Sequence, residues 1–367
     1  MSITYAPLPN WRTMLSILTG HASRPWRSAS GFSSESTGGY WYSRSAFILA
    51  DIWRHHQSTA TTGPGAIWIP DYFCNQSLMP LRELGADIVF YPITRTLEPD
   101  WSACRDLAGR SPPGLFVLVH YFGKWIDGTE ARAFTDQFGA WLIEDAAHVM
   151  QPITATERIG DFVFYSPHKT LAVPSGAFLQ TRNPDLAFDR QSHPPGKPPL
   201  AWLGKRLLEK LSPDALRRRR YAATLRPFDQ DPPTQPLEAE ASVSRHSLAG
   251  LKQMSQNLHH YASRRQRNCK AWRGLLSGRP LGVAPFHEQA KEEGPAPYRF
   301  IAAAETPDAA EAFYDLVRSK GIPAESWPDL PPEVLSDTKA HASALELRRR
   351  LVFLPCHQTI ETHEISL

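Results

Sequence analysis

Short, almost wholly apolar runs alternate with longer segments of helical spacing through the first half of the chain. Nearly continuous apolar runs are typical of strands that are covered on both faces. The intervening segments place apolar residues at the spacing of a helix face. This alternation predicts an α/β layer with a mainly parallel sheet. The predicted strands are Ala66–Pro70, Asp87–Tyr91, Leu115–Tyr121, Ala140–Glu144, Asp161–Ser166 and Gly176–Thr181, and the predicted helices are Ser45–Gln57, Cys74–Leu84 and Gly128–Phe138.

Proline-rich segments interrupt this pattern in the second half. Neither His193–Pro199 nor Asp229–Pro236 can continue a helix or a strand. Beyond them, Val243–Ser277 has helical spacing, and Tyr298–Glu305 followed by a helix at Asp308–Lys320 indicates a smaller α+β domain. The predicted division is a large domain at 1–228, a linker at 229–242 and a smaller domain at 243–367.

Composition narrows the class of protein. A chain of 367 residues with 42% hydrophobic content can bury a large core in two domains. Its 40 basic and 37 acidic residues nearly balance, which gives no reason to expect a nucleic-acid partner. The four cysteines include no Cys-x-x-Cys pair, as is typical of reduced thiols in a cytosolic protein. We see no signal-peptide pattern and no membrane-length apolar run, so we expect a cytoplasmic protein without a membrane partner.

An acid and a lysine stand at the ends of two predicted neighbouring strands. Asp145 follows Ala140–Glu144, and Lys169 follows Asp161–Ser166 after a Pro-His turn. An enzyme that uses pyridoxal phosphate (PLP) needs a carboxylate to keep the ring nitrogen protonated and a lysine to form the Schiff base. Alone, such an acid is often a helix cap and such a lysine is usually solvated. Their order between two apolar strands favours a PLP site.

Three further residues suit the same cofactor. Ala147 is small enough for the flat ring to lie against it, and His148 can hydrogen-bond the ring hydroxyl. Ser166 can contact the phosphate. No metal site is predicted, since the adjacent pairs His55–His56 and His259–His260 point to different sides of a helix.

At these residues the chain resembles the DegT/StrS sugar aminotransferases, members of the fold type I PLP enzymes. The resemblance covers nearly the whole chain, and its motifs occur in the family's order. Besides the Asp145 and Lys169 segments, they are Tyr42–Phe47, Ile69–Asn75, Val119–Gly123 and Leu354–Gln358.

The resemblance implies a large domain with a mainly parallel seven-stranded sheet between helices, and a smaller C-terminal α+β domain. Lys169 would form the internal aldimine, and Asp145 would pair with the pyridine nitrogen. Arg44 and Ser45 would offer backbone N–H groups and a hydroxyl to the phosphate. That role also has a physical basis, since a helix N-terminus favours an anion.

Three positions depart from the family pattern. Lys169 follows Ser166 by three residues, whereas many relatives have an interval of five. Cys74 stands where relatives place an aromatic residue over the ring, a role that Tyr72 or Phe73 could take. The stretch Pro174–Ala177 replaces a more glycine-rich one.

The family resemblance implies an aminotransferase that takes an amino group from glutamate to a nucleotide-linked keto sugar, in a homodimer whose partner chains complete each site. Two alternatives stay open. One is a PLP-dependent sugar dehydratase or lyase, although such relatives carry histidine in place of Lys169 and here His168 only adjoins it. The other is a non-catalytic regulatory homologue. The runs Arg217–Arg220 and Arg348–Arg350 are predicted to be solvated helix faces, with a substrate diphosphate as the second interpretation.

Overall fold

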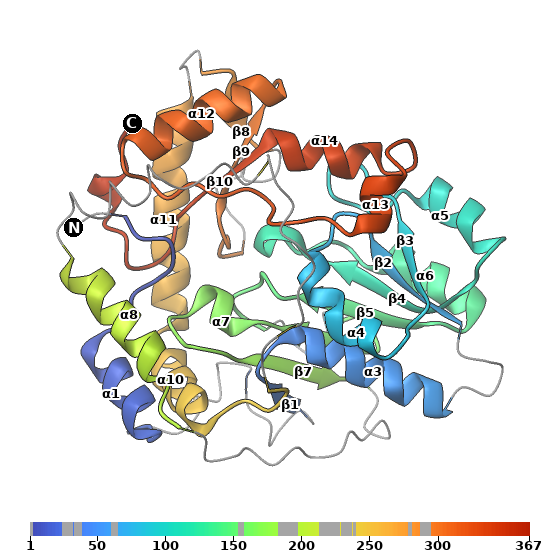
Figure 1. Ribbon diagram of the computed structural model, residues 1–367, viewed down its shortest axis with the longest axis horizontal. Coiled ribbons are helices and arrows are strands. Elements are labelled where there is room, and N and C mark those ends of the chain that lie inside the picture. Colours follow the sequence, from blue (N-terminus) through green and yellow to red (C-terminus); the bar gives the residue numbers. More distant parts are fainter. Residues whose placement is uncertain are drawn as a thin grey trace.

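A seven-stranded sheet forms the centre of the computed structural model (Figure 1). The structure describes residues 3–23, 32, 39–59, 65–152, 158–182, 197–212, 228, 237, 240–277, 281–286 and 295–367. The strand order is β1-β7-β6-β5-β4-β2-β3, and β7 runs opposite to the other six strands of this sheet. The strands are β1 (Gly39–Tyr42), β2 (Ala66–Pro70), β3 (Ile88–Tyr91), β4 (Pro113–Val119), β5 (Trp141–Ala146), β6 (Phe162–Tyr165) and β7 (Ala177–Thr181).

Both faces of this sheet are buried, which explains why its strands are nearly all apolar. In β6, Phe162 and Phe164 join the core that includes Ile48 and Ile52 of α3 (Ser45–Thr59). Val163, on the opposite face, joins a second core that includes Leu251 of α10 (Arg245–Ser255). Among the described residues, this half also contains the helices α1 (Trp11–Thr19), α4 (Met79–Glu83), α5 (Trp101–Ala108), α6 (Thr129–Phe138), α7 (Pro167–Thr170) and α8 (Leu200–Leu211), with 3-10 turns η2 (Asn75–Leu78) and η3 (Tyr121–Gly123).

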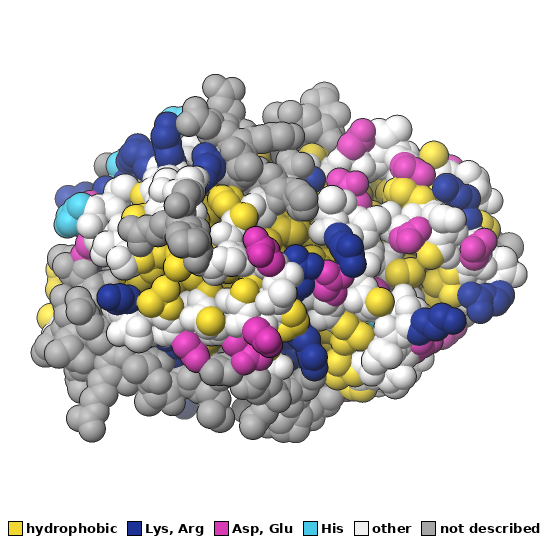
Figure 2. Space-filling model, turned by 90° about the horizontal axis from the view of Figure 1, so that it is seen from above, with side chains coloured by type: hydrophobic (Ala, Val, Ile, Leu, Met, Phe, Trp, Pro, Cys, Tyr) yellow, Lys and Arg dark blue, Asp and Glu magenta, His cyan; other side chains and the backbone are white. Residues whose placement is uncertain are grey.

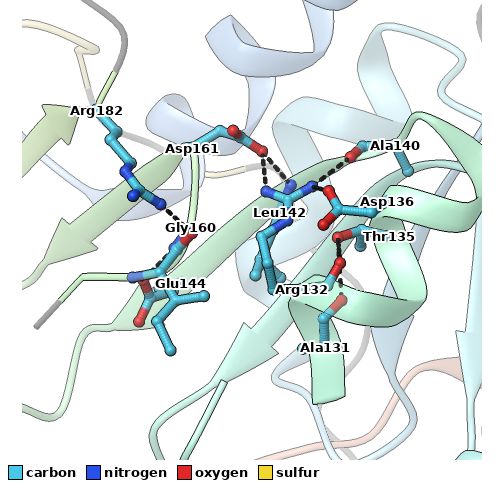
Figure 3. Close-up of polar contacts among 11 residues, drawn as sticks. Ala131, Arg132, Thr135, Asp136, Ala140, Leu142, Glu144, Gly160, Asp161 and Arg182 are labelled. Atoms are coloured by element: carbon cyan, nitrogen blue, oxygen red, sulfur yellow. Dashed lines mark hydrogen bonds and ion pairs between the residues drawn. The ribbon is translucent and has the colours of Figure 1, made fainter. Parts of the chain in front are cut away.

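Two carboxylates fix the ends of β5 and β6 against the surrounding chain (Figure 3). Asp161 accepts hydrogen bonds from the Arg132 guanidinium of α6 and from the Leu142 N–H, each at 2.8 Å. Buried Glu144 accepts the N–H groups of Ile159 at 2.9 Å and Gly160 at 2.6 Å. These contacts tie the strand that carries Asp145 to the chain segment just before β6.

A smaller antiparallel sheet, in the order β10-β9-β8, occupies the C-terminal part. Trp272 of the long helix α11 is fully buried in its core, which also contains Phe313 of α12. Thr306 caps α12 by accepting the Ala309 N–H at 3.1 Å, and Pro307 opens the helix. The elements of this part are α11 (Leu258–Leu276), β8 (Val283–Pro285), β9 (Phe300–Ala304), α12 (Pro307–Ser319), α13 (Pro332–Ser336), α14 (Ala342–Arg350), β10 (Leu351–Leu354) and η5 (Thr362–Glu364).

The structure confirms the predicted α/β fold, with its seven-stranded, mainly parallel sheet and a smaller α+β part. Two differences are informative. The predicted helix Val243–Ser277 is two helices, α10 and α11, and the predicted solvated run Arg348–Arg350 is wrong for Arg348, which is buried. The domain division stays a prediction, because most of the 229–242 linker lies outside the described residues. The described residues also leave out Arg217–Arg220 and most of His193–Pro199.

Charged side chains of both signs share the surface of the molecule. On the face shown in Figure 2, acidic and basic side chains are interspersed over the right-hand part. Within the described part of the chain, we find no helix long and apolar enough to cross a membrane. The same residues contain no cluster of histidine, cysteine and carboxylate side chains suited to a metal ion.

Candidate active site

A pocket opens at the carboxyl ends of β4 and β5, the edge at which ligands gather in parallel sheets. Five of the residues considered from the sequence line it, namely Asp145, Ala147, His148, Lys169 and Ser45, which is the first residue of α3. The other lining residues are Leu49, Phe73, Cys74, Ser77, Val119 and Trp327.

Asp145 and Lys169 form a pair of opposite charges in this pocket. Asp145 is buried near the end of β5, and its Oδ1 accepts the Ala147 N–H at 2.8 Å. Burial raises the pKa of Asp145, while the positive charge of Lys169 lowers it. Burial lowers the pKa of the Lys169 amine, while the charge of Asp145 raises it. A lysine with a lowered pKa has more of the free amine that attacks an aldehyde.

His148 lies beside the lysine, with its Nε2 at 3.3 Å from Lys169 Nζ. Its Nδ1 accepts the Phe122 N–H at 3.2 Å, and Phe122 takes a left-handed φ of 57° in the turn that makes this contact. The imidazole stacks on the Tyr298 ring, with centroids 4.3 Å apart and planes 6° apart. Burial, aided by the charge of Lys169, keeps the pKa of His148 well below its usual value. The neutral ring therefore carries its proton on Nε2, facing the pocket.

The three residues predicted to contact the phosphate, Ser45, Ser166 and Arg44, lie differently relative to the pocket. Ser45 lines the pocket at the first residue of α3, where free N–H groups and the helix dipole favour an anion. Ser166 does not line it, yet its buried Oγ has no hydrogen-bond partner among the described residues. Such an orphaned hydroxyl fits a site for a polar ligand group. The Arg44 side chain is turned toward the loop after Lys169 and donates to the Pro174 carbonyl at 3.2 Å.

Sequence reasoning missed Trp327, a wall of the pocket supplied by the C-terminal half. Its indole stacks on Tyr72, with centroids 4.4 Å apart and planes at 30°. Its buried Nε1–H has no hydrogen-bond partner among the described residues. Of the aromatic residues considered beside Cys74, Phe73 lines the pocket, whereas Tyr72 lies behind Trp327. A tryptophan 158 positions after Lys169 offers no motif that could have placed it here.

A buried arginine holds the chain just after Lys169. Arg265 of α11 donates to the Thr170 carbonyl at 2.8 Å and to the carbonyls of Pro297 and Tyr298, each at 3.0 Å. It also donates to Gln358 Oε1 at 2.9 Å, and Gln358 Nε2 donates to the same Thr170 carbonyl at 3.0 Å. The C-terminal motif Leu354–Gln358 thus reaches the lysine loop, and both donors on Thr170 come from the smaller part.

Comparison with solved structures identifies the fold. Spr1654 from Streptococcus pneumoniae, solved in a PLP form, matches with a TM-score of 0.66 at 14% identity, over 99% of this chain and 96% of that chain. DesI, solved in the presence of its TDP-sugar product, matches with a TM-score of 0.63 at 18% identity, over 98% of this chain and 88% of that chain. The fold is that of the fold type I PLP enzymes, as predicted.

The sequence segment that carries the site is similar to a known family. Residues 76–191, which include Asp145, His148 and Lys169, match the DegT/DnrJ/EryC1/StrS aminotransferase family. The predicted resemblance to this family is confirmed. Serine hydroxymethyltransferase of Synechococcus sp. (strain JA-3-3Ab) is 32% identical over 106 residues, which are 27% of this chain and 24% of that protein. The chain therefore spans about a quarter of the length of the curated relatives that it matches.

Proposed function

We propose that this protein is a PLP-dependent aminotransferase that transfers an amino group from glutamate to a keto sugar linked to a nucleotide. The observation that carries the proposal is the meeting of Asp145 and Lys169 in one pocket, within a segment that matches an aminotransferase family. The sugar acceptor is supported by DesI, a protein of the same fold solved with its TDP-sugar product. The donor, a homodimer and a cytoplasmic location stay predictions from the sequence.

The residues present fit the cofactor. Bound PLP would supply an aldehyde and a protonated ring that withdraws electrons from the reacting carbon. Lys169 would hold the aldehyde, and its amine, once released, would move a proton between the donor α-carbon and the cofactor carbon. Asp145 would keep the ring nitrogen protonated, and His148 would donate from Nε2 to the ring oxygen. Ser45 and Ser166 would bind the phosphate.

One observation favours the aminotransferase over the sugar dehydratase. A dehydratase of this fold would need a histidine at the cofactor in place of lysine. Here His168 is turned away, with its Nδ1 at 2.8 Å from the Gly176 carbonyl, and it does not line the pocket. Burial lowers the pKa of His168 to about 3, as expected for a neutral structural imidazole. Of His168 and Lys169, only Lys169 lines the pocket.

The test is covalent capture followed by a half-reaction. Borohydride should fix the cofactor's mass on the peptide that contains Lys169, and glutamate should bleach the visible absorbance of the unreduced, loaded protein. A nucleotide-linked keto sugar should then restore the absorbance and yield an amino sugar. Capture on a different lysine would refute the assignment of Lys169. A loaded protein that no amino donor bleaches would favour the lyase or the non-catalytic alternative.

Reversal of the bleaching by amino-acid ketones only would leave the cofactor site intact and refute the sugar acceptor. Glutamine and other donors serve as parallel trials, because glutamate is inferred from the family resemblance.

A further inference from the structure

The helices α1 (Trp11–Thr19) and α8 (Leu200–Leu211) expose an unusual amount of apolar surface. Nine large hydrophobic side chains are exposed among the described residues, and six of them belong to these two helices. We call these six the α1–α8 patch: Trp11 (60% exposed), Leu15 (60%), Leu18 (44%), Leu200 (63%), Leu208 (69%) and Leu211 (67%). Scattered apolar residues need no explanation, but a concentration of this kind marks an interaction surface.

The patch is a fixed face of the fold. α1 buries Ile17 against α10, where Gly250 allows the close approach, since a Cβ there would lie 2.6 Å from Ile17 Cγ1. Its end is tied by His246 Nδ1, at 2.8 Å from the Ile17 carbonyl. Because Trp11, Leu15 and Leu18 follow one another at helical spacing, they lie on the face that points away from α10.

The two exposed stripes lie beside each other. Figure 1 shows α1 and α8 as neighbours at the lower left of the view, and residues of the two helices are in contact. Lys210 of α8 donates to the Pro9 carbonyl at 3.0 Å and lies 4.9 Å from the centre of the Trp11 ring. On α8, Leu200, Leu208 and Leu211 share one face, and only Leu203 is fully buried on the other.

The charge around the patch decides what can cover it. Residues 3–23 and 197–212 contain five basic side chains, namely Lys197, Lys205, Lys210, Arg12 and Arg206, and a single acid, Glu209. A symmetric contact between two copies would place this basic surface against itself, which like charges oppose. Leucine and tryptophan on one face of a helix, flanked by lysine and arginine, are typical of helices that lie in the interface of an anionic membrane.

We propose that the α1–α8 patch docks the protein on the surface of an anionic lipid bilayer, with the six apolar side chains inserted at the headgroup level. This binding is peripheral. The sequence-based expectation of no membrane partner rested on the lack of a spanning segment, and that lack does not bear on a surface-docked helix pair.

The experiment uses the full chain and vesicles of phosphatidylcholine with or without phosphatidylserine. The protein should sediment with the vesicles that contain phosphatidylserine and stay in solution with pure phosphatidylcholine, and added salt should weaken binding. Lys205→Glu changes the charge by two units and should weaken binding about 25-fold, at about fivefold for each unit. Lys320→Glu, which changes an exposed lysine at the end of α12 by the same charge, is the matched control and should bind as the wild type.

A second variant tests the apolar contribution without changing charge. The double change Leu208→Gln and Leu211→Gln should abolish sedimentation, while circular dichroism and cofactor absorbance stay unchanged because both leucines are exposed. Failure to bind anionic vesicles, or undiminished binding by this variant, overturns the proposal. So does light scattering in which the wild type is an oligomer that the same variant dissociates, since the patch would then join two copies of the chain.

Discussion

Replacing Arg265 with methionine should loosen the backbone at Lys169 and destabilise the fold. The guanidinium is fully buried, and no carboxylate is among the four acceptors that it contacts. Burial accordingly lowers its pKa. Methionine keeps much of the side-chain volume but removes every donor. The variant therefore isolates the hydrogen bonds from the packing.

The expected loss of folding free energy depends on which hydrogen bonds each acceptor retains in the Arg265→Met variant. The Thr170 carbonyl retains its bond from Gln358 Nε2, and the Pro297 carbonyl retains a weak contact from Cys356 Sγ at 3.6 Å. The bonds from Arg265 to Tyr298 and Gln358 are lost. Hydrogen bonds to charged groups contribute roughly 1.5–3 kcal/mol each, but removal of a buried unpaired charge recovers part of this. We expect a net loss of about 3 kcal/mol.

Two assays separate stability from positioning. Urea unfolding of the cofactor-free protein measures the first, and the fraction of limiting PLP that borohydride traps on Lys169 measures the second. Arg265→Lys should lie between methionine and the wild type, because an ammonium has donors but lacks the planar fork. Arg267→Met, an exposed change on the same helix, is the control.

A variant of Gln358 tests the second hydrogen-bond donor to the Thr170 carbonyl. Gln358→Leu should cost about 1 kcal/mol. The double variant should lose more than the sum of the two, because Thr170 then has neither donor. An Arg265→Met protein that unfolds at the same urea concentration as Arg267→Met, with unchanged trapping, would show that these contacts position nothing.

Three further predictions concern the pocket and its neighbours. Asp145→Asn should fold and bind cofactor but lose turnover by about a hundredfold or more, which single-turnover absorbance measures; wild-type rates would make Asp145 a structural cap. Trp327→Phe keeps the ring over Tyr72 but removes the unpaired N–H, so the KM of one substrate should rise about tenfold with little change in kcat; a KM unchanged for both substrates would exclude that bond. Burial depresses the pKa values of His148, His168 and His357 in the folded chain. In the unfolded chain histidine has its usual pKa of about 6.5, so below that pH the unfolded chain binds more protons than the folded chain. Urea titrations should show full stability above that pH and a loss of about 1.4 kcal/mol per unit per histidine below it; a flat profile from pH 7 to 5 would contradict their burial in neutral form.

The central sheet could be predicted because its strands are covered on both sides. Such strands are apolar at every position, as Phe162–Tyr165 is, so their location shows in the sequence even without a period. The helix α5 was missed because it is short and half polar, although Asp100 is a standard N-cap and accepts the Ala103 N–H at 3.1 Å. The break between α10 and α11 falls at Gln256–Asn257, without a glycine or proline to mark it.

The residues of the site were recognisable where chemistry and sequence proximity coincide. Asp145, Ala147 and His148 are near neighbours in the sequence, and Ser166 and Lys169 follow the next strand, β6. The order of these residues along the chain made the site recognisable from the sequence.

Trp327 and Arg265 lack that advantage, because each reaches the site only through the docking of the smaller part on the larger. Their sequence surroundings are uninformative: Trp327 lies in a loop before prolines, and Arg265 lies within a basic stretch of α11 that reads as a solvated face. In the fold, both are almost fully buried, and both contact residues from distant segments. Arginine can be buried this way only where several carbonyls converge, and that convergence is a property of the assembled tertiary structure. The chain thus encodes its cofactor chemistry locally, whereas the residues that shape and hold the pocket depend on contacts that no local pattern specifies.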